Sequence, residues 1–550
     1  PNAAWPPLPS FTHSPADMST AKRVLVSDPI EQVAIDILHD AGIQVDQKSK
    51  LSEAELIAAI GEYDGLIVRS GTQVTAAVVE AADKLKVIGR AGTGVDNIDC
   101  NAATRKGVVV MNTPGGNTLS AAEHTMAMIM SLARNVAQGD ASLKAGKWDR
   151  KKYMGVELNE KTLGVLGLGR VGREVVSRCQ SFGMKVVGYD PMFPAAAAQK
   201  IGIEPVSAAE CMRRADFLTI HVPLLDETRN MVNAQTLATM KPGVRIVNCA
   251  RGGIIDEAAL LASIEAGHVA GAALDVFESE PPLEHEWPLI KHPKVIATPH
   301  LGASTEEAQA RVAAEIATEM VNAFGGKPVS GVVNAPDLTL SQKPELKPWM
   351  NLAEAMGLLL AQRLSGQVRR VHVGVAGEAI AKAGSLCAAA AITGIFEAVT
   401  GEKLNLINAP IVAREREIEL VHEQVSDAVF HAVVTVTVET GKATHSVSGT
   451  LFNNQPRVIR VDDHEVEFAP EGYLLLYSNI DKPGVLSRVS GALAEEQVNI
   501  ITATVSAANP SGKVLGVMSV DKVLSSALIQ RCKALPDVSN VQLCYIRRVE

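Results

Sequence analysis

Three short segments carry side chains that could remove a proton and hold a carboxylate. Residues 248–253 contain Arg251, residues 275–282 contain Glu280, and residues 298–302 contain His300. With an ordinary pKa near 6.5, a His can take the proton of a hydroxyl, and a carboxylate beside it orients the ring. The planar guanidinium of an Arg can grip a carboxylate with two hydrogen bonds. Together these residue types could oxidise a 2-hydroxy acid, whereas each alone would more often be structural.

A glycine-rich motif upstream indicates where a dinucleotide would bind. Residues 167–172 follow an expected strand, open an expected helix, and match the pattern GxGxxG. Gly167 would permit the turn, Gly169 would admit the pyrophosphate, and Gly172 would let the helix pack on the strand. Arg170 and Val171 begin that helix, where Arg170 either holds a phosphate or points into solvent. Asp190 ends the next strand and would bind the ribose hydroxyls, which favours NAD over NADP.

These residues need parallel sheets to position them. Apolar runs at 23–27, 65–69 and 86–89 alternate with helical patterns, and six more such runs follow after residue 160. That rhythm predicts βαβ units and doubly wound parallel sheets. A mostly apolar helix is expected at 120–137, between two such units, and another helix at 305–324. The six later strands are expected at 162–167, 185–189, 217–221, 244–248, 271–276 and 295–298.

The pattern changes after residue 335. Residues 433–438 and 445–451 alternate β-formers, which predicts antiparallel strands in an α+β domain over 336–468. From residue 469 to 550 the order strand, helix, strand, strand, helix, strand predicts a ferredoxin-like βαββαβ unit.

In its motifs and their order the chain resembles the D-isomer-specific 2-hydroxyacid dehydrogenase family. The resemblance implies an NAD-binding Rossmann domain at 119–305, inserted into a Rossmann-like substrate domain formed by 21–118 and 306–335. It also implies that Arg251 binds the substrate carboxylate while Glu280 and His300 form the proton-transfer pair. Further contacts to the cofactor are implied at Pro223, Cys249, Ala250, Asp275 and Gly302, with Asp275 on the nicotinamide carboxamide.

Additional arginines make the first domain similar to the branch of that family that oxidises 3-phosphoglycerate. A substrate with a carboxylate and a phosphate suits several bidentate arginines. Arg69 is the first candidate for the phosphate, followed by Arg90 and Arg134; Gly71 stands where some relatives have another arginine. Gly92 and Asn117 are expected to meet the carboxylate and the hydroxyl. Solvent-facing arginines remain the alternative for each position.

The tail resembles an ACT domain, preceded by a region similar to the intervening, allosteric substrate-binding-like domain of long-form family members. The resemblance implies an L-serine effector bound by Asn479, Asp481 and Asn499. An inert dimerisation unit is the alternative. Family resemblance also implies a homodimer or homotetramer.

Composition limits the remaining possibilities. The net charge of −9 disfavours a nucleic-acid binder, and no apolar run reaches the roughly 20 residues that span a bilayer. Seven scattered cysteines without a CxxC pair predict reduced thiols and no metal site. We expect a cytoplasmic protein, or a plastid one if the disordered extension expected at residues 1–20 ends a transit peptide. The functional alternatives are a glyoxylate or hydroxypyruvate reductase and an NAD-sensing, corepressor-like binding protein.

Overall fold

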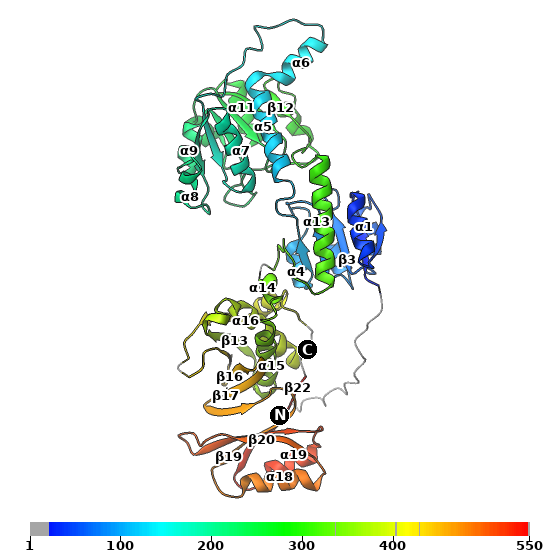
Figure 1. Cartoon of the computed structure of the whole chain (residues 1–550), viewed down its shortest axis with the longest axis vertical. Coiled ribbons are helices and arrows are strands. Elements are labelled where there is room, and N and C mark those ends of the chain that lie inside the picture. The colour runs from blue at the N-terminus through cyan, green and yellow to red at the C-terminus, as the bar shows by residue number, and fades with distance from the viewer. Residues whose placement is uncertain (1–20, 336, 402–403, 428, 548–550) are drawn as a thin grey trace.

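The computed structural model describes residues 21–335, 337–401, 404–427 and 429–547. The extension expected at residues 1–20 lies outside these ranges. Four units follow one another along the long axis: two α/β units, an α+β unit and a small four-stranded unit (Figure 1). The predicted fold class is confirmed.

The first unit is a five-stranded parallel sheet in the order β2-β1-β3-β4-β5. Its inner strands are continuous apolar runs because helices cover both faces, and all four residues of β3 are buried. Helix α13 follows the second unit in the chain, returns to the first unit and packs beside α1. The elements are β1 (Arg23–Val26), α1 (Gln32–Asp40), β2 (Gln44–Gln47), α2 (Glu53–Ile60), β3 (Gly65–Val68), α3 (Ala76–Glu80), β4 (Val87–Arg90), α4 (Cys100–Arg105), β5 (Val109–Met111) and α13 (Glu306–Phe324).

The second unit is a parallel sheet of seven strands in the order β12-β11-β10-β9-β6-β7-β8. Six of them were expected; β8 has two residues, too few to show a period of alternation. Chain order reverses between β6 and β9, and ligands bind at such a switch point in open α/β sheets. The strands are β6 (Thr162–Leu166), β7 (Lys185–Tyr189), β8 (Glu204–Pro205), β9 (Phe217–Ile220), β10 (Val244–Asn248), β11 (Val269–Leu274) and β12 (Val295–Ala297).

Helices flank this second sheet on both faces, and α5 enters it from the first unit. The single helix expected at 120–137 is two helices, because Asn135 adopts the left-handed conformation with φ 52°. The helices are α5 (Thr118–Arg134), α6 (Val136–Lys144), α7 (Arg170–Ser181), α8 (Ala195–Lys200), α9 (Ala208–Arg214), α10 (Ala234–Thr239), α11 (Glu257–Glu265), the 3-10 helix η1 (Glu284–Glu286) and α12 (Trp287–Ile290).

The third unit packs two helices on a six-stranded mixed sheet in the order β14-β13-β15-β16-β17-β18. Only the β13–β14 pair is parallel among the described strands of this sheet. The elements are α14 (Leu338–Ser341), α15 (Lys347–Arg363), β13 (Val368–Ala376), η2 (Glu378–Ala383), α16 (Gly384–Thr400), α17 (Ala409–Glu415), β14 (Glu419–Gln424), β15 (Val433–Thr440), β16 (Thr444–Phe452), β17 (Gln455–Val461) and β18 (His464–Phe468).

One helical segment of this unit, Ile380–Thr400, is long and apolar enough to cross a membrane. Its most apolar window is 72% buried within the protein, packed against α15 and the sheet. Core helices of soluble proteins commonly have this composition, so the segment is weak evidence for a membrane span.

Two asparagines fasten the third unit to the first. The side-chain amides of Asn405 and Asn408 donate to the backbone carbonyls of Gly107 (3.0 Å) and Arg105 (3.3 Å). Both acceptors lie at the end of α4, and α17 contacts α4 directly. These hydrogen bonds join the beginning of α17 to the substrate unit.

The last unit has the predicted βαββαβ order, with strands arranged β20-β21-β19-β22. Helices α18 and α19 cover one face, while the other face shares a hydrophobic core with α15 of the third unit. Leu476 points into that shared core, and Leu475 points toward α18 and α19. The elements are β19 (Gly472–Ile480), α18 (Val485–Glu495), β20 (Ile500–Val505), β21 (Lys513–Val520), α19 (Ser526–Lys533) and β22 (Val538–Ile546).

Replacing Leu476 by Ala tests whether the last two units unfold together. We expect the free energy of unfolding to fall by about 2–5 kcal/mol, as for other buried Leu→Ala changes, and both units to be destabilised. Hydrogen exchange should show weaker protection in α15 as well as in β19. The matched Leu475→Ala variant should weaken protection in the last unit only. Equal protection of α15 in the two variants would contradict a shared core.

Candidate active site

The glycine-rich loop turns from β6 into α7 as its sequence predicts. Gly167 has φ 97°, and a Cβ there would lie 2.5 Å from the carbonyl oxygen of His221. A Cβ on Gly172 would collide with the carbonyl oxygen of Gly167. The Cβ position of Gly169 instead faces open space, at the start of a helix whose first N–H groups have no partner within the helix. Such a helix start fits the pyrophosphate of NAD.

Asp190 lies beside this loop at the end of β7. Its Oδ2 accepts the Leu168 backbone N–H at 2.8 Å, and its Oδ1 accepts that of Met192 at 2.8 Å. The carboxylate therefore fixes the glycine loop in addition to the ribose contact that the sequence predicts. Val171 packs partly against the core beneath α7, so it supports the helix start.

Arg170 and Pro223 are the two other residues predicted to contact the cofactor near this loop, and both form hydrogen bonds within the protein. Arg170 reaches across to the first unit, where its Nη1 donates to the carbonyl oxygen of Pro114. Pro223 is exposed after β9, and its carbonyl accepts the Thr228 hydroxyl at 2.6 Å. The neighbouring His221 was not predicted; burial lowers its pKa to about 4, so it is neutral at physiological pH.

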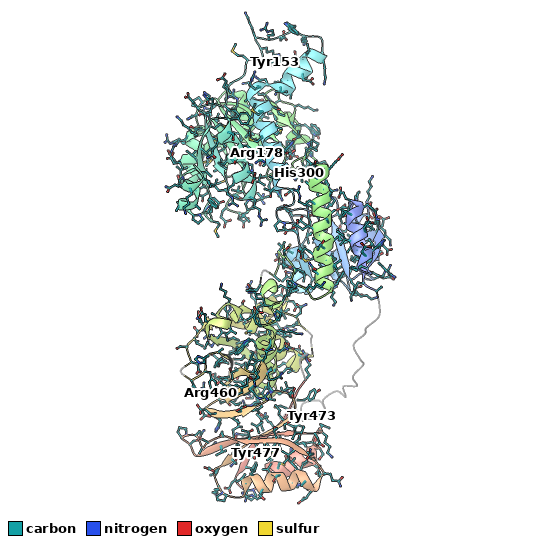
Figure 2. The ribbon with its side chains drawn as sticks, in the orientation of Figure 1. Tyr153, Arg178, His300, Arg460, Tyr473 and Tyr477 are labelled. Atoms are coloured by element: carbon teal, nitrogen blue, oxygen red, sulfur yellow. The ribbon has the colours of Figure 1, made fainter. Side chains whose placement is uncertain are left out.

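The predicted proton-transfer pair is assembled. The His300 Nδ1 lies 2.6 Å from Oε2 of Glu280, and both side chains are partly exposed. A carboxylate can only accept, so Nδ1–H donates to Glu280 and Nε2 keeps its lone pair for a proton. Figure 2 shows His300 between the two α/β units, near the start of α13. This is the arrangement that a general base requires.

Asp275 is fully buried and holds the loop that carries His300. Its Oδ1 accepts the Leu301 N–H at 2.7 Å and the Thr298 hydroxyl at 2.5 Å, while Oδ2 accepts the Gly302 N–H at 2.8 Å. Burial raises the pKa of Asp275, but hydrogen bonds, first that of His124, outweigh it and hold the pKa below its ordinary value. Asp275 thus has four partners within the protein, and the predicted contact with the nicotinamide would be a fifth.

His124 is a site residue that sequence reasoning missed. Its Nε2 lies 3.1 Å from Oδ1 of Asp275 and 3.2 Å from the Thr298 hydroxyl. The only available signal was a His on the otherwise apolar helix α5. Ser120, one turn earlier, donates to the Gly302 carbonyl at 2.9 Å, so α5 supports the His300 loop at two points.

The loop after β10 presents Arg251 and two predicted cofactor residues. Cys249 is largely buried, and burial raises the pKa of its thiol to about 12, so it is not a nucleophile. The Ala250 N–H donates to Oδ1 of Asn248 at 3.0 Å. Gly252, which follows Arg251, lies against the Phe277 carbonyl and so brings this loop beside the one carrying Glu280.

Three of the predicted arginines converge where the two α/β units meet. Burial, and after it the charges of Arg251 and Arg69, lower the pKa of Arg90 to about 10. The Nε of Arg90 is buried without a hydrogen-bond partner among the described residues. Arg251 donates from Nε to Asp96 at 2.9 Å, a cross-unit ion pair that was not predicted. A cation cluster with an unpaired buried donor suits a multiply charged anion.

Gly92 and Asn117 flank this cluster. The Gly92 carbonyl accepts the Thr113 N–H, and a Cβ on Gly92 would collide with the guanidinium of Arg90. Asn117 precedes α5, where its Oδ1 accepts the Thr93 hydroxyl at 2.8 Å. Both residues lie where the substrate prediction places them, beside the arginines of the first unit.

The structure does not bring Arg134 to this cluster. Asn117 and Arg134 lie at opposite ends of α5, which at 1.5 Å per residue puts them roughly 24 Å apart. Arg134 is exposed there. Its prediction as a substrate contact is therefore wrong within one chain, because a rigid 17-residue helix separates it from the cleft.

The three predicted effector residues do not form one site within a chain. Asn479 pairs with Val514, whereas Asn499 precedes the Ile500–Val520 pair at the other end of the sheet. At about 3.3 Å per residue, the two ends are roughly 20 Å apart. Asn479 is almost buried and donates to the Ile480 carbonyl, while Asp481 and Asn499 are exposed. The strand register thus separates the three residues within one chain, and the predicted effector site stays a prediction.

Comparisons with known proteins agree with this geometry. Residues 126–302 match the NAD-binding domain of D-isomer specific 2-hydroxyacid dehydrogenases, residues 345–462 the D-3-phosphoglycerate dehydrogenase intervening domain, and residues 473–536 the ACT domain. Among solved structures, a glyoxylate reductase from Paecilomyes thermophila is 27% identical with TM-score 0.52, covering 56% of this chain and 96% of its own. A D-lactate dehydrogenase from Aquifex aeolicus, complexed with NAD and lactic acid, is 26% identical with TM-score 0.51, covering 58% and 97%.

The fold and site therefore define an NAD-dependent D-isomer specific 2-hydroxyacid dehydrogenase. Relatives named D-3-phosphoglycerate dehydrogenase extend over nearly the whole chain. That of Methanocaldococcus jannaschii is 42% identical over 94% of this chain and 99% of its own length. The human one is 44% identical over 92% and 96%. The chain belongs to the D-3-phosphoglycerate dehydrogenase family. Within the described residues no cluster of three His, Cys, Asp or Glu side chains is placed to hold a metal.

A half-buried acid next to the catalytic loop should give stability a pH dependence. Burial raises the pKa of Glu257 to about 7, and its Oε1 accepts the Glu278 N–H at 2.9 Å. The unfolded chain loses this proton near its ordinary value of 4.5, so stability should fall as pH rises from 4.5 to about 7. Glu257→Gln keeps a hydrogen-bond acceptor but has no charge, so its melting temperature should change less with pH over that window.

The control is Glu284→Gln, an exposed acid on η1. Its melting temperatures should follow those of the parent chain. A parent and a Glu257→Gln variant with equal slopes would contradict a shifted Glu257.

Proposed function

We propose that this protein oxidises 3-phosphoglycerate to 3-phosphohydroxypyruvate with NAD, the first step of phosphorylated L-serine synthesis. The observation that carries the proposal is the convergence of Arg69, Arg90 and Arg251 in the cleft that holds His300 and Glu280. A substrate with a carboxylate and a phosphate has enough negative charge to occupy such a cluster. The relatives over most of the chain bear the same function in their names.

The residues divide the work of the reaction. Nε2 of His300 takes the hydroxyl proton, and Glu280 stabilises the imidazolium that forms. Arg251 holds the carboxylate next to the reacting carbon, while Arg90 and Arg69 offset the phosphate charge. The Gly167–Gly172 loop and Asp190 would hold NAD, which when bound accepts the hydride from C2. The ion pair between Arg251 and Asp96 joins the two units across the cleft.

Two alternatives are less well supported. A glyoxylate or hydroxypyruvate reductase would share Arg251, Glu280 and His300 but needs no phosphate cluster. An NAD-sensing binding protein would not need the aligned His300–Glu280 pair. Selective oxidation of a phosphorylated acid separates the proposal from the first alternative, and turnover itself separates it from the second.

Changing His300 to Ala should abolish most turnover. A general base contributes about 10²–10⁴-fold, so kcat for 3-phosphoglycerate should fall by that factor while NADH affinity stays unchanged. NADH formation is followed by absorbance, with D-glycerate and D-lactate as poor substrates. His285→Ala, on the exposed η1, should keep full activity. Near-normal turnover of His300→Ala, or equal activity on unphosphorylated acids, would refute the assignment.

For the ACT unit we propose an L-serine site completed by a second chain. Asp481 and Asn499 are exposed at opposite ends of the sheet, so two units packed side by side in opposite directions would bring them together. Asp481 would meet the serine ammonium. Inhibition of NADH formation by L-serine, absent in Asp481→Ala, tests this site; an unchanged response in the variant would remove Asp481 from it.

We further propose that the α6 arm forms a homodimer interface. The segment from Val136 to Met154 projects from the second unit, as α6 and Tyr153 show at the top of Figures 1 and 2. Four of its large apolar side chains are more than half exposed: Val136, Leu143, Trp148 and Met154. Monomeric proteins seldom leave such a group in water, and the arm's projection suits a reciprocal embrace by a second copy.

The double variant Trp148→Asp/Met154→Asp should be smaller in solution than the parent. Light scattering measures the mass, and we expect it to halve at micromolar concentration because two charges would enter the apolar interface. The control is Met192→Asp, an equally exposed Met on another loop, which should leave the mass unchanged. An unchanged mass in the double variant would rule out this surface.

A further inference from the structure

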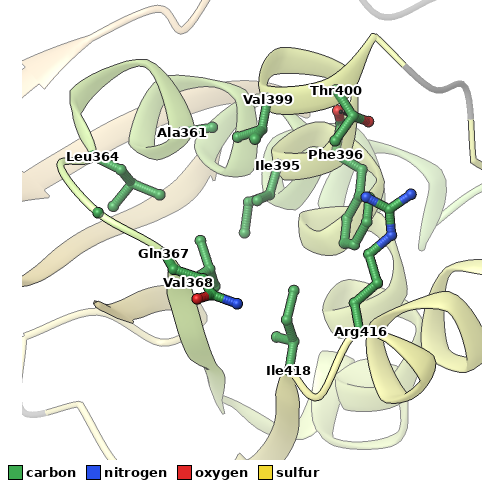
Figure 3. A pocket seen from close by; sticks show the side chains of 11 residues that line it. Ala361, Leu364, Gln367, Val368, Ile395, Phe396, Val399, Thr400, Arg416 and Ile418 are labelled. Atoms are coloured by element: carbon green, nitrogen blue, oxygen red, sulfur yellow. Dashed lines mark hydrogen bonds between the residues drawn. The ribbon is translucent and has the colours of Figure 1, made fainter. Parts of the chain in front are cut away.

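A pocket lies in the third unit, outside the cleft described above. Its cavity has a volume of about 240 Å³ and sits where α15 and α16 end and where β13 and β14 begin (Figure 3). Leu364, Val368, Ile395 and Ile418 point into the open centre of this view. No residue that lines the pocket comes from the two α/β units.

The size and walls of the pocket favour an apolar occupant. Protein interiors are close-packed, and an engineered cavity of roughly 150 Å³ with similar walls binds benzene. The walls join the main core of the unit directly, since Ile395 and Phe396 are almost fully buried. An aromatic ring with a short side chain would therefore fit the cavity. Its binding would also remove the apolar surface of the ring and of the pocket walls from water.

One end of the pocket is polar. The guanidinium of Arg416 stacks on the Phe396 ring, 5.1 Å from its centroid, so its position at the rim is fixed. A guanidinium has five N–H donors and can bind a carboxylate in addition to other partners. The amide of Gln367 also lines the pocket, across from Arg416 in Figure 3. The Thr400 hydroxyl is already used, since it donates to the Phe396 carbonyl at 3.0 Å.

We propose that this pocket binds a small monocarboxylate with an aromatic or branched apolar body. The apolar body would contact Leu364, Val368 and Ile395, and the carboxylate would meet Arg416. The substrate of the active site does not suit the pocket, because a hydroxyl and a phosphate would be buried against apolar walls. The ligand is therefore chemically distinct from both the substrate and a polar amino acid such as serine.

Calorimetric titration of the full chain with 3-phenylpropionate tests the site. The chain carries Arg251→Met, so that the carboxylate cannot bind in the active-site cleft. For a ligand of this size we expect a dissociation constant of about 1 mM or below, with one site per chain. The uncharged 3-phenylpropanol should bind at least tenfold more weakly. Absence of saturable binding, or equal binding of acid and alcohol, would overturn the proposal.

Two added substitutions locate the binding. Val399→Trp, at the partly exposed rim, should fill the cavity and weaken binding of the acid at least tenfold. Arg416→Met should weaken the acid by a similar factor and leave the alcohol unchanged. Arg369→Met, outside the pocket, should change neither. Thermal unfolding checks that each variant is folded, and undiminished binding in both folded pocket variants would place the ligand elsewhere.

Discussion

The active site depends on one buried carboxylate and the donors that satisfy it. An unpaired charge at Asp275 would be too costly in a fully buried position, so four groups from two segments converge on it. Two are backbone N–H groups of the loop that carries His300, and a third is His124 on α5. The same contacts that make Asp275 tolerable thus fix the position of the catalytic base. Because His124 lies on α5, these contacts also fasten that helix to the second sheet.

Electrostatics within the cleft differ from those of the whole molecule. The chain carries a net charge of −9, yet Arg69, Arg90 and Arg251 repel one another at the boundary between the units. Repulsion of this kind destabilises the empty cleft and is relieved when an anion enters. Asp96 offsets part of it by pairing with Arg251 across the boundary. A polyanionic substrate would therefore be drawn in by local charge that the overall composition conceals.

The sequence predicted the fold and most of the catalytic set, since both follow from local patterns. A glycine loop before a helix, or an apolar run that ends in Arg, Glu or His, can be recognised from neighbouring residues alone. His124 and Asp96 could not be found in this way, because their roles arise from residues about 150 positions away. Arg134 was wrongly predicted to lie in the cleft of its own chain, because the length of helix α5 separates it from that cleft. The motif also did not show that Asn479 and Asn499 lie at opposite ends of the sheet, because strand direction decides this and motif spacing does not record it.

The two asparagine bonds at the end of α4 determine which parts of the molecule travel together. Because Asn405 and Asn408 hold the third unit to the substrate unit, and the last two units share a core, residues 337–547 are coupled to the first sheet. Opening the cleft means rotating the NAD-binding sheet against this larger body. The NAD-binding unit is thus the smaller moving part, and the third and last units move together with the substrate unit. Anything that clamps two tails together would hold two substrate units at a fixed mutual angle.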